Sequence, residues 1–188
     1  TICHRLLCFV VCVLFVTRID KNPNYGLKDM TEKLSVAIIT YNEEKNIGEC
    51  IDSVYDIADE IIVLDSFSND NTEQICRQFP KVKFFQNPFE GYTRQKNLVN
   101  EKCTGDWILS IDADERVSPE LNKSIVKFLS QASSTDIAGA RFPRLTYHMA
   151  KAIRHCGWYP NSRYRLFRSE KGEWIGDSLH EKTRLGGG

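Results

Sequence analysis

The stretch Leu34-Ser-Val-Ala-Ile-Ile-Thr40 decides the fold class, because it is a nearly continuous apolar run of strand length that passes into the polar segment 41–44. Such a run predicts a strand with both faces buried in a parallel sheet. Later apolar runs repeat the pattern more briefly, over 61–64, 82–85 and 107–111. Because helical patterns separate these runs, the sequence predicts an α/β domain with a mostly parallel, Rossmann-like sheet flanked by helices.

The helical patterns are amphipathic, and they cover 46–58, 71–79, 92–103 and 118–132. The last begins with Ser118-Pro119-Glu120, which supplies a capping side chain, a proline in the first turn and an acidic group near the helix N-terminus. Beyond residue 137 the pattern changes, since 137–147 and 163–168 alternate arginine with apolar residues and no long helix separates them. We therefore expect a mixed or antiparallel edge in the C-terminal third.

The composition is that of an ordinary folded domain. Hydrophobic residues make up 41% and charged residues 27% of the 188 residues, which excludes a disordered tail or a collagen-like repeat. Lys plus Arg and Asp plus Glu are 25 each, so binding to nucleic acid through its phosphates is disfavoured. None of the seven cysteines stands in a Cys-x-x-Cys pair, which indicates a reducing, cytoplasmic location without structural zinc.

The balanced total conceals an acidic body and a basic C-terminal segment. Residues 31–140 carry 11 basic and 19 acidic side chains, whereas 141–188 carry 10 and 4. The basic segment is either a solvated strand face paired with the acidic body or a contact surface for an anionic partner, for which arginine is well suited. The candidate contacts are Arg141, Arg144, Arg154, Arg163, Arg165 and Arg168.

The ends of the chain do not follow the pattern of the domain. Leu6 to Val16 is an apolar run of 11 residues, too short to span a bilayer, which needs about 20. We expect 1–29 to form an extension outside the folded domain, with a shallow membrane anchor as the alternative, and 30–188 to form a single domain. The final three glycines predict a flexible tail or a truncation point.

Polar side chains follow several of the predicted strands. Thr40 ends the first strand, Asp65 follows the second, and Asp112 and Asp114 follow the run 107–111. The carboxyl ends of parallel strands form the edge of a sheet where ligands bind. On extended backbone Asp112 and Asp114 would point the same way, and a cation such as Mg²⁺ or Mn²⁺ would relieve their repulsion. The alternative is a pair of solvated loop carboxylates.

Other residues fit a nucleotide but have structural alternatives. Asp65 could accept hydrogen bonds from a nucleoside, or it could form a local turn or helix cap. Arg94 and Lys96 lie near the start of a predicted helix, where positive charge opposes the helix dipole. A bound diphosphate would remove that conflict, whereas the alternative is a solvated helix face.

The order and spacing of the motifs resemble the family 2 inverting glycosyltransferases of GT-A fold over about residues 34–185. The motifs are Val36-Ala-Ile-Ile-Thr-Tyr-Asn-Glu-Glu44, Ile61-Ile-Val-Leu-Asp65-Ser-x-Ser-x-Asp70-x-Thr72, Arg94-x-Lys96-Asn97 and Gly105-Asp106-Trp-Ile-Leu-x-Ile-Asp112-Ala-Asp114-Glu115. The later segment 157–181 resembles the WaaE/KdtX-like β-glycosyltransferases of the lipopolysaccharide inner core. Phe67 departs from the smaller residue usual in that loop, and relatives usually continue beyond the point where this chain ends.

The resemblance implies a role for each matching residue. Thr40 and Glu43 would line the nucleobase pocket, and Asp65 would contact the nucleoside. Arg94 or Lys96 would lie near the diphosphate. Asp112 would contact the ribose beside the metal, and Asp114 would bind the metal. The catalytic base would be Glu181, with Asp177 as the alternative.

The resulting hypothesis is inverting transfer of a hexose from a nucleotide diphosphate sugar, with UDP-glucose as the expected donor and Mg²⁺ or Mn²⁺ as cofactor. The acceptor would be an anionic inner-core glycan on a lipid, which would place the protein in the cytoplasm or on the cytoplasmic face of the inner membrane. The alternatives are a catalytically silent nucleotide-sugar-binding module and a sugar-nucleotidyltransferase. The second would need a glycine-rich loop after the first strand, and residues 40–48 offer only Gly48.

Overall fold

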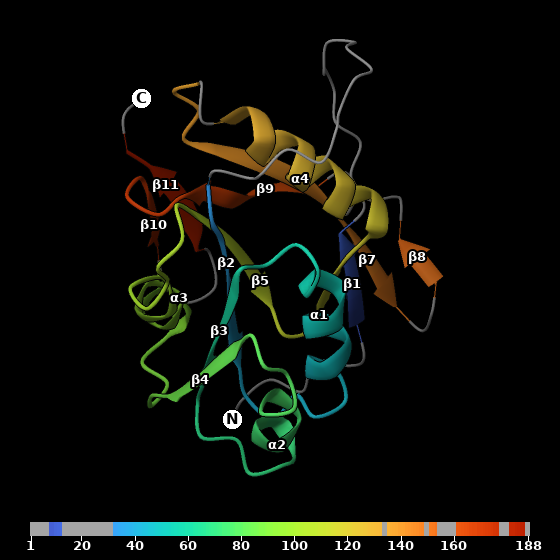
Figure 1. The fold of residues 1–188 in the computed structure, drawn as a ribbon. Helices are drawn as coiled ribbons and strands as arrows, with labels where there is room; N and C mark the ends of the chain where they lie inside the picture. The colour runs from blue at the N-terminus through green and yellow to red at the C-terminus, as the bar shows by residue number, and fades with distance from the viewer. Residues whose placement is uncertain are drawn as a thin grey trace.

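The computed structural model describes residues 8–12, 32–132, 135–148, 151–153, 161–176 and 181–186. It has a nine-stranded sheet with the order β4-β3-β2-β5-β9-β7-β1-β6, and β8 pairs with β7 (Figure 1). A separate pair of strands, β10 and β11, lies beside the helix α3. The arrangement is the one that the GT-A resemblance implies, a mostly parallel sheet flanked by helices with antiparallel strands at one side.

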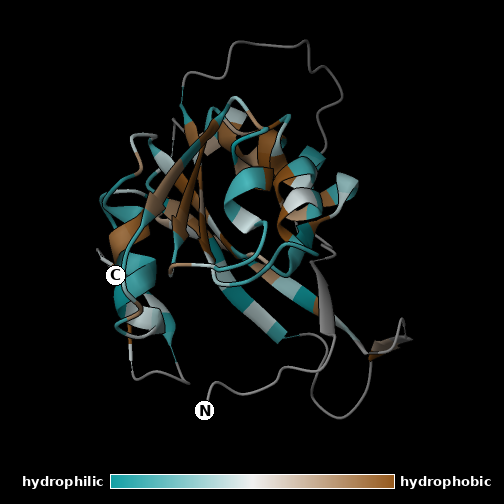
Figure 2. Cartoon of the chain, turned by 90° about the horizontal axis from the view of Figure 1, so that it is seen from below, coloured by the Kyte–Doolittle hydropathy of each residue, from teal (hydrophilic) through white to brown (hydrophobic). Residues whose placement is uncertain are grey.

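The parallel part of the sheet matches the predicted apolar runs. Its strands are β2 (Leu34–Thr40), β3 (Glu60–Asp65), β4 (Val82–Gln86) and β5 (Trp107–Asp112). Every residue of β3 is buried, whereas β4, at the sheet edge, is largely exposed. Figure 2 shows the hydrophobic colour gathered in the central strands. Burial on both faces explains why these strands are apolar throughout rather than alternating.

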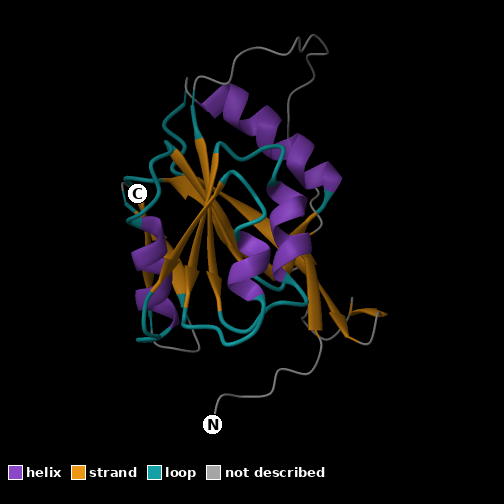
Figure 3. Cartoon of the chain, turned by 60° about the horizontal axis from the view of Figure 1, so that its bottom comes forward, coloured by secondary structure: helices purple, strands orange, loops and turns teal. Residues whose placement is uncertain are grey.

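Helices cover both faces of this sheet, as Figure 3 shows. On one face, α1 (Ile47–Val54) and α4 (Pro119–Ala132) pack against the larger core cluster, and α2 (Thr72–Cys76) lies beside α1. On the other face, α3 (Tyr92–Asn100) contributes Val99 to a smaller cluster with Ile62 and Phe167. The sheet therefore separates two cores.

The antiparallel part confirms the expected mixed edge. It consists of β7 (Gly139–His148) and β9 (Asn161–Arg168), with β9 antiparallel to both β5 and β7. The shorter elements are β1 (Cys8–Cys12), β6 (Glu115–Val117), β8 (Lys151–Ile153), β10 (Gly172–Ile175) and β11 (Lys182–Leu185). None of these short strands was predicted, because segments of three to five residues are too short to show a clear periodicity.

The strand β1 bears on the expected extension. Residues 8–12 pair antiparallel with β7 and parallel with β6. The other residues of the expected extension lie outside the described residues. That 1–29 form an extension outside the folded domain therefore stays a prediction. Among the described helices, none is both long and apolar enough to cross a membrane.

The helix starts agree with the predictions better than the helix ends. Ser118 Oγ accepts a hydrogen bond from the Leu121 N–H at 3.2 Å, which confirms it as the cap of α4. In contrast, α1 ends four residues before the predicted residue 58, since the chain turns there to enter β3. Cys50 and Cys76 are buried free thiols, as expected, and burial raises the pKa of Cys76 to about 12.

Candidate functional site

Three adjacent parallel strands end together at one edge of the sheet. Thr40 of β2 stands opposite Asp65 of β3, and Ile39 of β2 stands opposite Asp112 of β5. The pairing confirms that residues from separate motifs come together at one edge of the sheet. Their meeting follows from the parallel register, because every strand runs in the same direction.

Asp65 organises the loop that follows β3. Its buried carboxylate accepts hydrogen bonds from the Ser68 N–H at 2.8 Å and from Gln86 Nε2 at 3.3 Å. The Ser68 hydroxyl in turn accepts from the Asn42 N–H at 2.8 Å, which joins this loop to the one after β2. The local turn role is therefore present in the structure, and a nucleoside contact by Asp65 stays a prediction.

This loop contains strained backbone. Phe67 has φ of 60° and Asn42 has φ of 53°, both in the left-handed region. Asparagine tolerates that conformation, but a bulky aromatic residue does so at a cost. Phe67 is nevertheless 54% exposed, so its ring gains little burial in return. The hydrogen bonds of Asp65 and Asn42 hold the backbone in this shape.

Glu43 and its neighbours bind the N-terminus of α2. The Glu43 N–H donates to Thr72 Oγ1 at 2.9 Å, and the Glu44 N–H donates to Asp70 Oδ2 at 3.1 Å. Burial of Asp70 acts to raise its pKa, but bonds from Thr72 and from the Glu44 N–H outweigh burial and lower it. Asp70 also accepts the Thr72 N–H at 2.9 Å and thus caps the start of α2.

Thr40 provides an unsatisfied group at the same edge. Its side chain is buried, and Oγ1 has no hydrogen-bond partner within the described part of the chain. A buried hydroxyl without a partner costs free energy, typically about 1–3 kcal/mol. A ligand atom that reached Thr40 would remove this cost, which supports the predicted role of Thr40 beside a bound nucleobase.

Asp112 is the centre of an ion-pair network. Lys96 Nζ lies 3.1 Å from Oδ1, and Arg165 Nη2 lies 3.1 Å from Oδ2. Glu115 extends the network, because it pairs with Arg165 at 2.7 Å and accepts the Asp112 N–H at 3.0 Å. Burial acts to raise the pKa of Asp112, but the Lys96 and Arg165 cations outweigh burial and hold that pKa well below its usual range.

This network changes the argument for a metal between the two aspartates. Residues 113–114 form a turn between β5 and β6, so the expectation of extended backbone at Asp114 was wrong. Protein cations already compensate the charge of Asp112, so its carboxylate does not require a metal ion. The assignment of Asp112 as a metal ligand stays a prediction.

Asp114 is the better candidate for a metal ligand. It is half-buried in the turn that follows the end of β5. Among the described residues, no group of three His, Cys, Asp or Glu side chains gathers to hold an ion. Mg²⁺ commonly binds through one or two carboxylates together with substrate phosphates. The residues present fit that mode, with Asp114 as the protein ligand, and do not fit a metal cage built of protein alone.

Arg94 and Lys96 have different surroundings in the structure. The Arg94 side chain is exposed and lies 3.5 Å from Glu90. Lys96 is only 2% exposed, because it pairs with Asp112 and Glu181 and its ammonium lies 4.3 Å from the centre of the Trp174 ring. The alternative of a solvated helix face therefore holds for Arg94 and is wrong for Lys96. A diphosphate contact by either residue stays a prediction.

Glu181 reaches the same site from the far end of the sequence. Its Oε1 lies 3.3 Å from Lys96 Nζ, and its side chain is partly exposed. Glu181 and Asp112 therefore both pair with the same cation, the Lys96 ammonium. The alternative base, Asp177, lies outside the described residues.

The basic segment divides into buried and exposed arginines. Arg165 is buried in the network, and Arg168 pairs with Glu32 at 3.1 Å, so the expectation that both form an anionic-acceptor surface was wrong. Arg144 is partly buried beside Glu115 at 3.5 Å. Arg141 and Arg163 are exposed, and an acceptor contact by them stays a prediction. Arg154 lies outside the described residues.

Two contributors to the site make contacts that could not be predicted from the sequence. Glu115 lay within a quoted motif, but its pairing with Arg165 depends on β9 lying next to β5. The second is Trp174, which is buried and whose ring packs against the Lys96 ammonium of α3. Tertiary pairing of this kind leaves no local pattern in a sequence.

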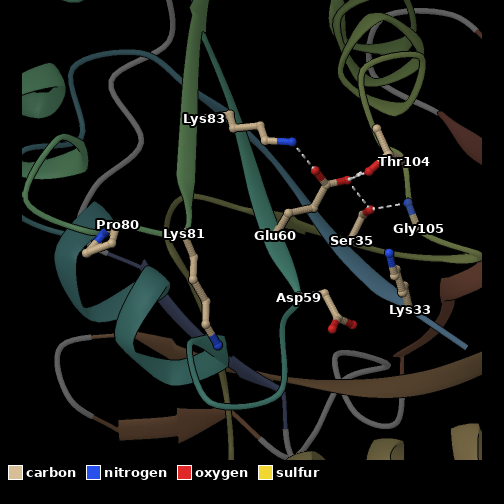
Figure 4. Close-up of a pocket in the computed structure, with 9 residues that line it drawn as sticks. All are labelled: Lys33, Ser35, Asp59, Glu60, Pro80, Lys81, Lys83, Thr104 and Gly105. Atoms are coloured by element: carbon tan, nitrogen blue, oxygen red, sulfur yellow. Dashed lines mark hydrogen bonds and ion pairs between the residues drawn. The ribbon is translucent and has the colours of Figure 1, made fainter. Parts of the chain in front are cut away.

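The opposite edge of the sheet holds a cavity of about 450 Å³ (Figure 4). Glu60 is at its centre and accepts hydrogen bonds from Lys83 Nζ at 2.7 Å, Ser35 Oγ at 2.6 Å and the Thr104 N–H at 2.6 Å. These contacts join the starts of β2, β3 and β4 and are satisfied within the protein. The cavity therefore lies away from the site at the strand ends.

The comparisons with known proteins give the family. A model described as glycosyl transferase family 2 matches residues 35–182. The lipopolysaccharide core biosynthesis glycosyltransferase LpsC of Rhizobium meliloti is 33% identical over 153 residues, which cover 79% of this chain and 56% of LpsC. An uncharacterized glycosyltransferase of Rickettsia conorii is 44% identical over 98 residues, which cover 52% of this chain and 34% of that protein.

Solved structures overlap with part of the chain. Residues 1–349 of S. aureus TarS in complex with UDP-GlcNAc are 28% identical, with a TM-score of 0.48 over 54% of this chain and 32% of that chain. The Pyrobaculum calidifontis mannosyltransferase in complex with GDP-Man and Mn²⁺ is 24% identical, with a TM-score of 0.49 over 63% of this chain and 38% of that protein. The chain spans about a third of the length of the Rickettsia conorii relative and about half of LpsC. Because the family model matches most of its residues, the chain belongs to glycosyl transferase family 2.

Proposed function

We propose that this chain is the nucleotide-sugar-binding and catalytic part of an inverting glycosyltransferase. The observation that carries the proposal is the register of β3, β2 and β5, which brings Asp65, Thr40 and Asp112 to one edge. The unpartnered hydroxyl of Thr40 supports a ligand there. The relatives are named as glycosyltransferases, which supports the same reaction class.

The donor would lie along this edge. Its nucleoside would approach Thr40, Glu43 and Asp65, and its diphosphate would approach the turn that carries Asp114. A Mg²⁺ or Mn²⁺ ion held by Asp114 and the diphosphate oxygens would supply charge stabilisation for the departing nucleotide. Asp112 would meet the ribose while Lys96 and Arg165 keep its carboxylate ionised and fixed in orientation.

Glu181 is proposed as the general base. The carboxylate would take the proton from the acceptor hydroxyl as the acceptor oxygen attacks the anomeric carbon opposite the leaving nucleotide. Such a positioned base typically contributes about 10²–10⁴-fold to the rate. Lys96 fixes one oxygen of Glu181 at 3.3 Å, and the partial exposure of the side chain leaves room for an acceptor to approach.

The name of one relative supports a more specific acceptor. LpsC is named as a lipopolysaccharide core enzyme, which supports an anionic core glycan as acceptor and hence work at the cytoplasmic face of the inner membrane. The exposed arginines Arg141 and Arg163 offer contacts for its phosphates. UDP-glucose is the first donor to test.

The test is release of the nucleotide from UDP-glucose, UDP-GlcNAc and GDP-mannose, with Mn²⁺, and with and without lipopolysaccharide core acceptors. We expect nucleoside diphosphate as product, and loss of its release in Asp114→Asn but not in the control Asp136→Asn, which changes an exposed carboxylate paired with Lys171. Binding without release would indicate a silent module. Release of pyrophosphate would indicate a nucleotidyltransferase.

A further inference from the structure

The pair β10–β11 carries the proposed base but is not part of the main sheet. The two strands pair only with each other among the described strands, with Trp174 opposite Thr183 and Ile175 opposite Lys182. Glu181 directly precedes β11. A two-stranded pair is at best marginally stable by itself. Contacts with the rest of the molecule must therefore fix the position of Glu181.

The helix α3 supplies such contacts in the form of backbone-like hydrogen bonds. Asn97 Nδ2 donates to the Trp174 carbonyl at 2.9 Å, and Asn97 Oδ1 accepts the Trp174 N–H at 2.9 Å. One amide side chain thus satisfies both backbone groups of a strand residue, as a neighbouring strand would. One turn earlier on α3, Thr93 Oγ1 donates to the Gly176 carbonyl at 2.8 Å.

Side-chain packing completes the attachment. Trp174 is 4% exposed, and the centre of its ring lies 4.3 Å from the Lys96 ammonium and 5.7 Å from the Arg165 guanidinium. Buried cation–π contacts of this kind are attractive and help to hold the ring in place. The same Lys96 ammonium lies 3.3 Å from Glu181. The Trp174 backbone, the Trp174 ring and the Glu181 carboxylate are therefore all in contact with the neighbouring residues Lys96 and Asn97 of α3, while β11 is also attached to β9 by the hydrogen bond from Thr183 Oγ1 to the Tyr164 carbonyl at 3.0 Å.

We infer that Asn97 and Thr93 are positioning residues, which hold β10 on α3 and thereby place the Glu181 carboxylate beside Lys96. This inference rests on the proposed function of Glu181 as base. The resemblance implies a diphosphate contact for Arg94 or Lys96 in the same segment. Asn97 has a different role, because its amide is directed at the Trp174 backbone.

The test compares Asn97→Ala with Asn100→Ala in the full chain. Asn100 lies on the same helix, and its side-chain amide has no hydrogen-bond partner in the described part of the protein, which makes it a matched control. Hydrogen exchange should become faster across 172–185 in Asn97→Ala and stay unchanged in β2 and β5. Nucleotide release should fall by about tenfold or more, while the Kd for UDP with Mn²⁺ stays within about twofold.

A milder pair of variants guards against loss of folding. Thr93 is partly exposed, so Thr93→Val removes only its hydrogen bond to Gly176. Thr93→Val should accelerate exchange in 172–185 and slow release, whereas Thr93→Ser keeps the hydroxyl and should behave as the unchanged protein. If Asn97→Ala and Thr93→Val match Asn100→Ala in both exchange and release, the inference is wrong.

The same experiment separates this inference from the proposed function. If the unchanged chain releases no nucleotide from any donor, the proposed function fails, and the exchange measurement alone decides whether Asn97 holds the strand pair. If exchange rises in Asn97→Ala but release is unaffected, the positioning of a catalytic group is refuted, although the attachment is real.

Discussion

Arg165 Nη2 lies 2.7 Å from Glu115 Oε1, and both side chains are buried although the residues are 50 positions apart in the chain. The same guanidinium lies 3.1 Å from Asp112. A buried ion pair contributes little compared with a well-packed apolar pair, but removal of one partner leaves an uncompensated charge. In this network, therefore, removal of one partner should destabilise the protein more than removal of both.

We predict that Arg165→Met lowers the free energy of unfolding by about 3–5 kcal/mol, because Glu115 would lose its closest cation. Arg165→Met combined with Glu115→Gln should recover part of that loss, since the buried charge is then removed with its partner. Urea unfolding of both single variants and the double variant measures the coupling. Additive losses would show that the pair is not energetically linked.

Acid stability should depend on Glu60 at the opposite edge of the sheet. Burial acts to raise its pKa, but bonds from Lys83, Ser35 and Thr104 outweigh burial and lower the pKa from 4.5 to about 2. A lowered folded-state pKa stabilises the protein above pH 4.5, and this contribution is lost as the pH falls towards 2. The shift corresponds to roughly 3 kcal/mol.

Glu60→Gln removes this titration and provides the comparison. The unchanged chain should exceed Glu60→Gln in free energy of unfolding at pH 6, and the difference should shrink by roughly 3 kcal/mol between pH 6 and pH 2. Urea unfolding across that range measures it. A gap that stays constant with pH would mean that the Glu60 carboxylate is not specially stabilised in the folded state.

The continuous apolar strands could be predicted from the sequence because burial on both faces removes polar residues from them. The runs 34–40, 61–64 and 107–111 fall within β2, β3 and β5, and their parallel register then brings the strand-end residues together. Thr40, Asp65 and Asp112 were found by that logic, which needs only strand direction and not side-chain contacts.

The rest depended on contacts between distant segments. The compensation of Asp112 by Lys96 and Arg165 arises because α3 and β9 pack beside β5, which no local periodicity encodes. The prediction of a metal ion beside Asp112 rested on carboxylate repulsion, but Lys96 and Arg165 already compensate that charge. The attachment of β10 to Asn97 was missed for the same reason.

Phe67 should report strain in the loop after β3. Its positive φ costs a bulky residue about 1–2 kcal/mol, whereas glycine adopts the conformation freely. Phe67→Gly should therefore be more stable than Phe67→Ala, in which the Cβ remains, by about 1 kcal/mol. Thermal unfolding of the two variants isolates the backbone effect. Equal stabilities would show that the loop relaxes without strain.

Glu181→Gln should separate binding from transfer. The amide keeps the size of the side chain but cannot accept the acceptor proton, so transfer should fall by about 10²–10⁴-fold while UDP binding is retained. Rates with saturating donor and a core-glycan acceptor measure the effect. Unchanged transfer would move the base to Asp177, for which Asp177→Asn is the corresponding variant.

The central claim is that the ends of β2, β3 and β5 bind a nucleotide diphosphate together with a divalent ion held by Asp114. Calorimetric titration of the full chain with UDP, in Mn²⁺ and then in EDTA, tests it most directly. We predict saturable binding in Mn²⁺ that weakens by about tenfold or more, or at least 1.4 kcal/mol, in EDTA and in Asp114→Asn. An absence of heat with UDP and with GDP, or equal affinity in Asp114→Asn, would contradict the account.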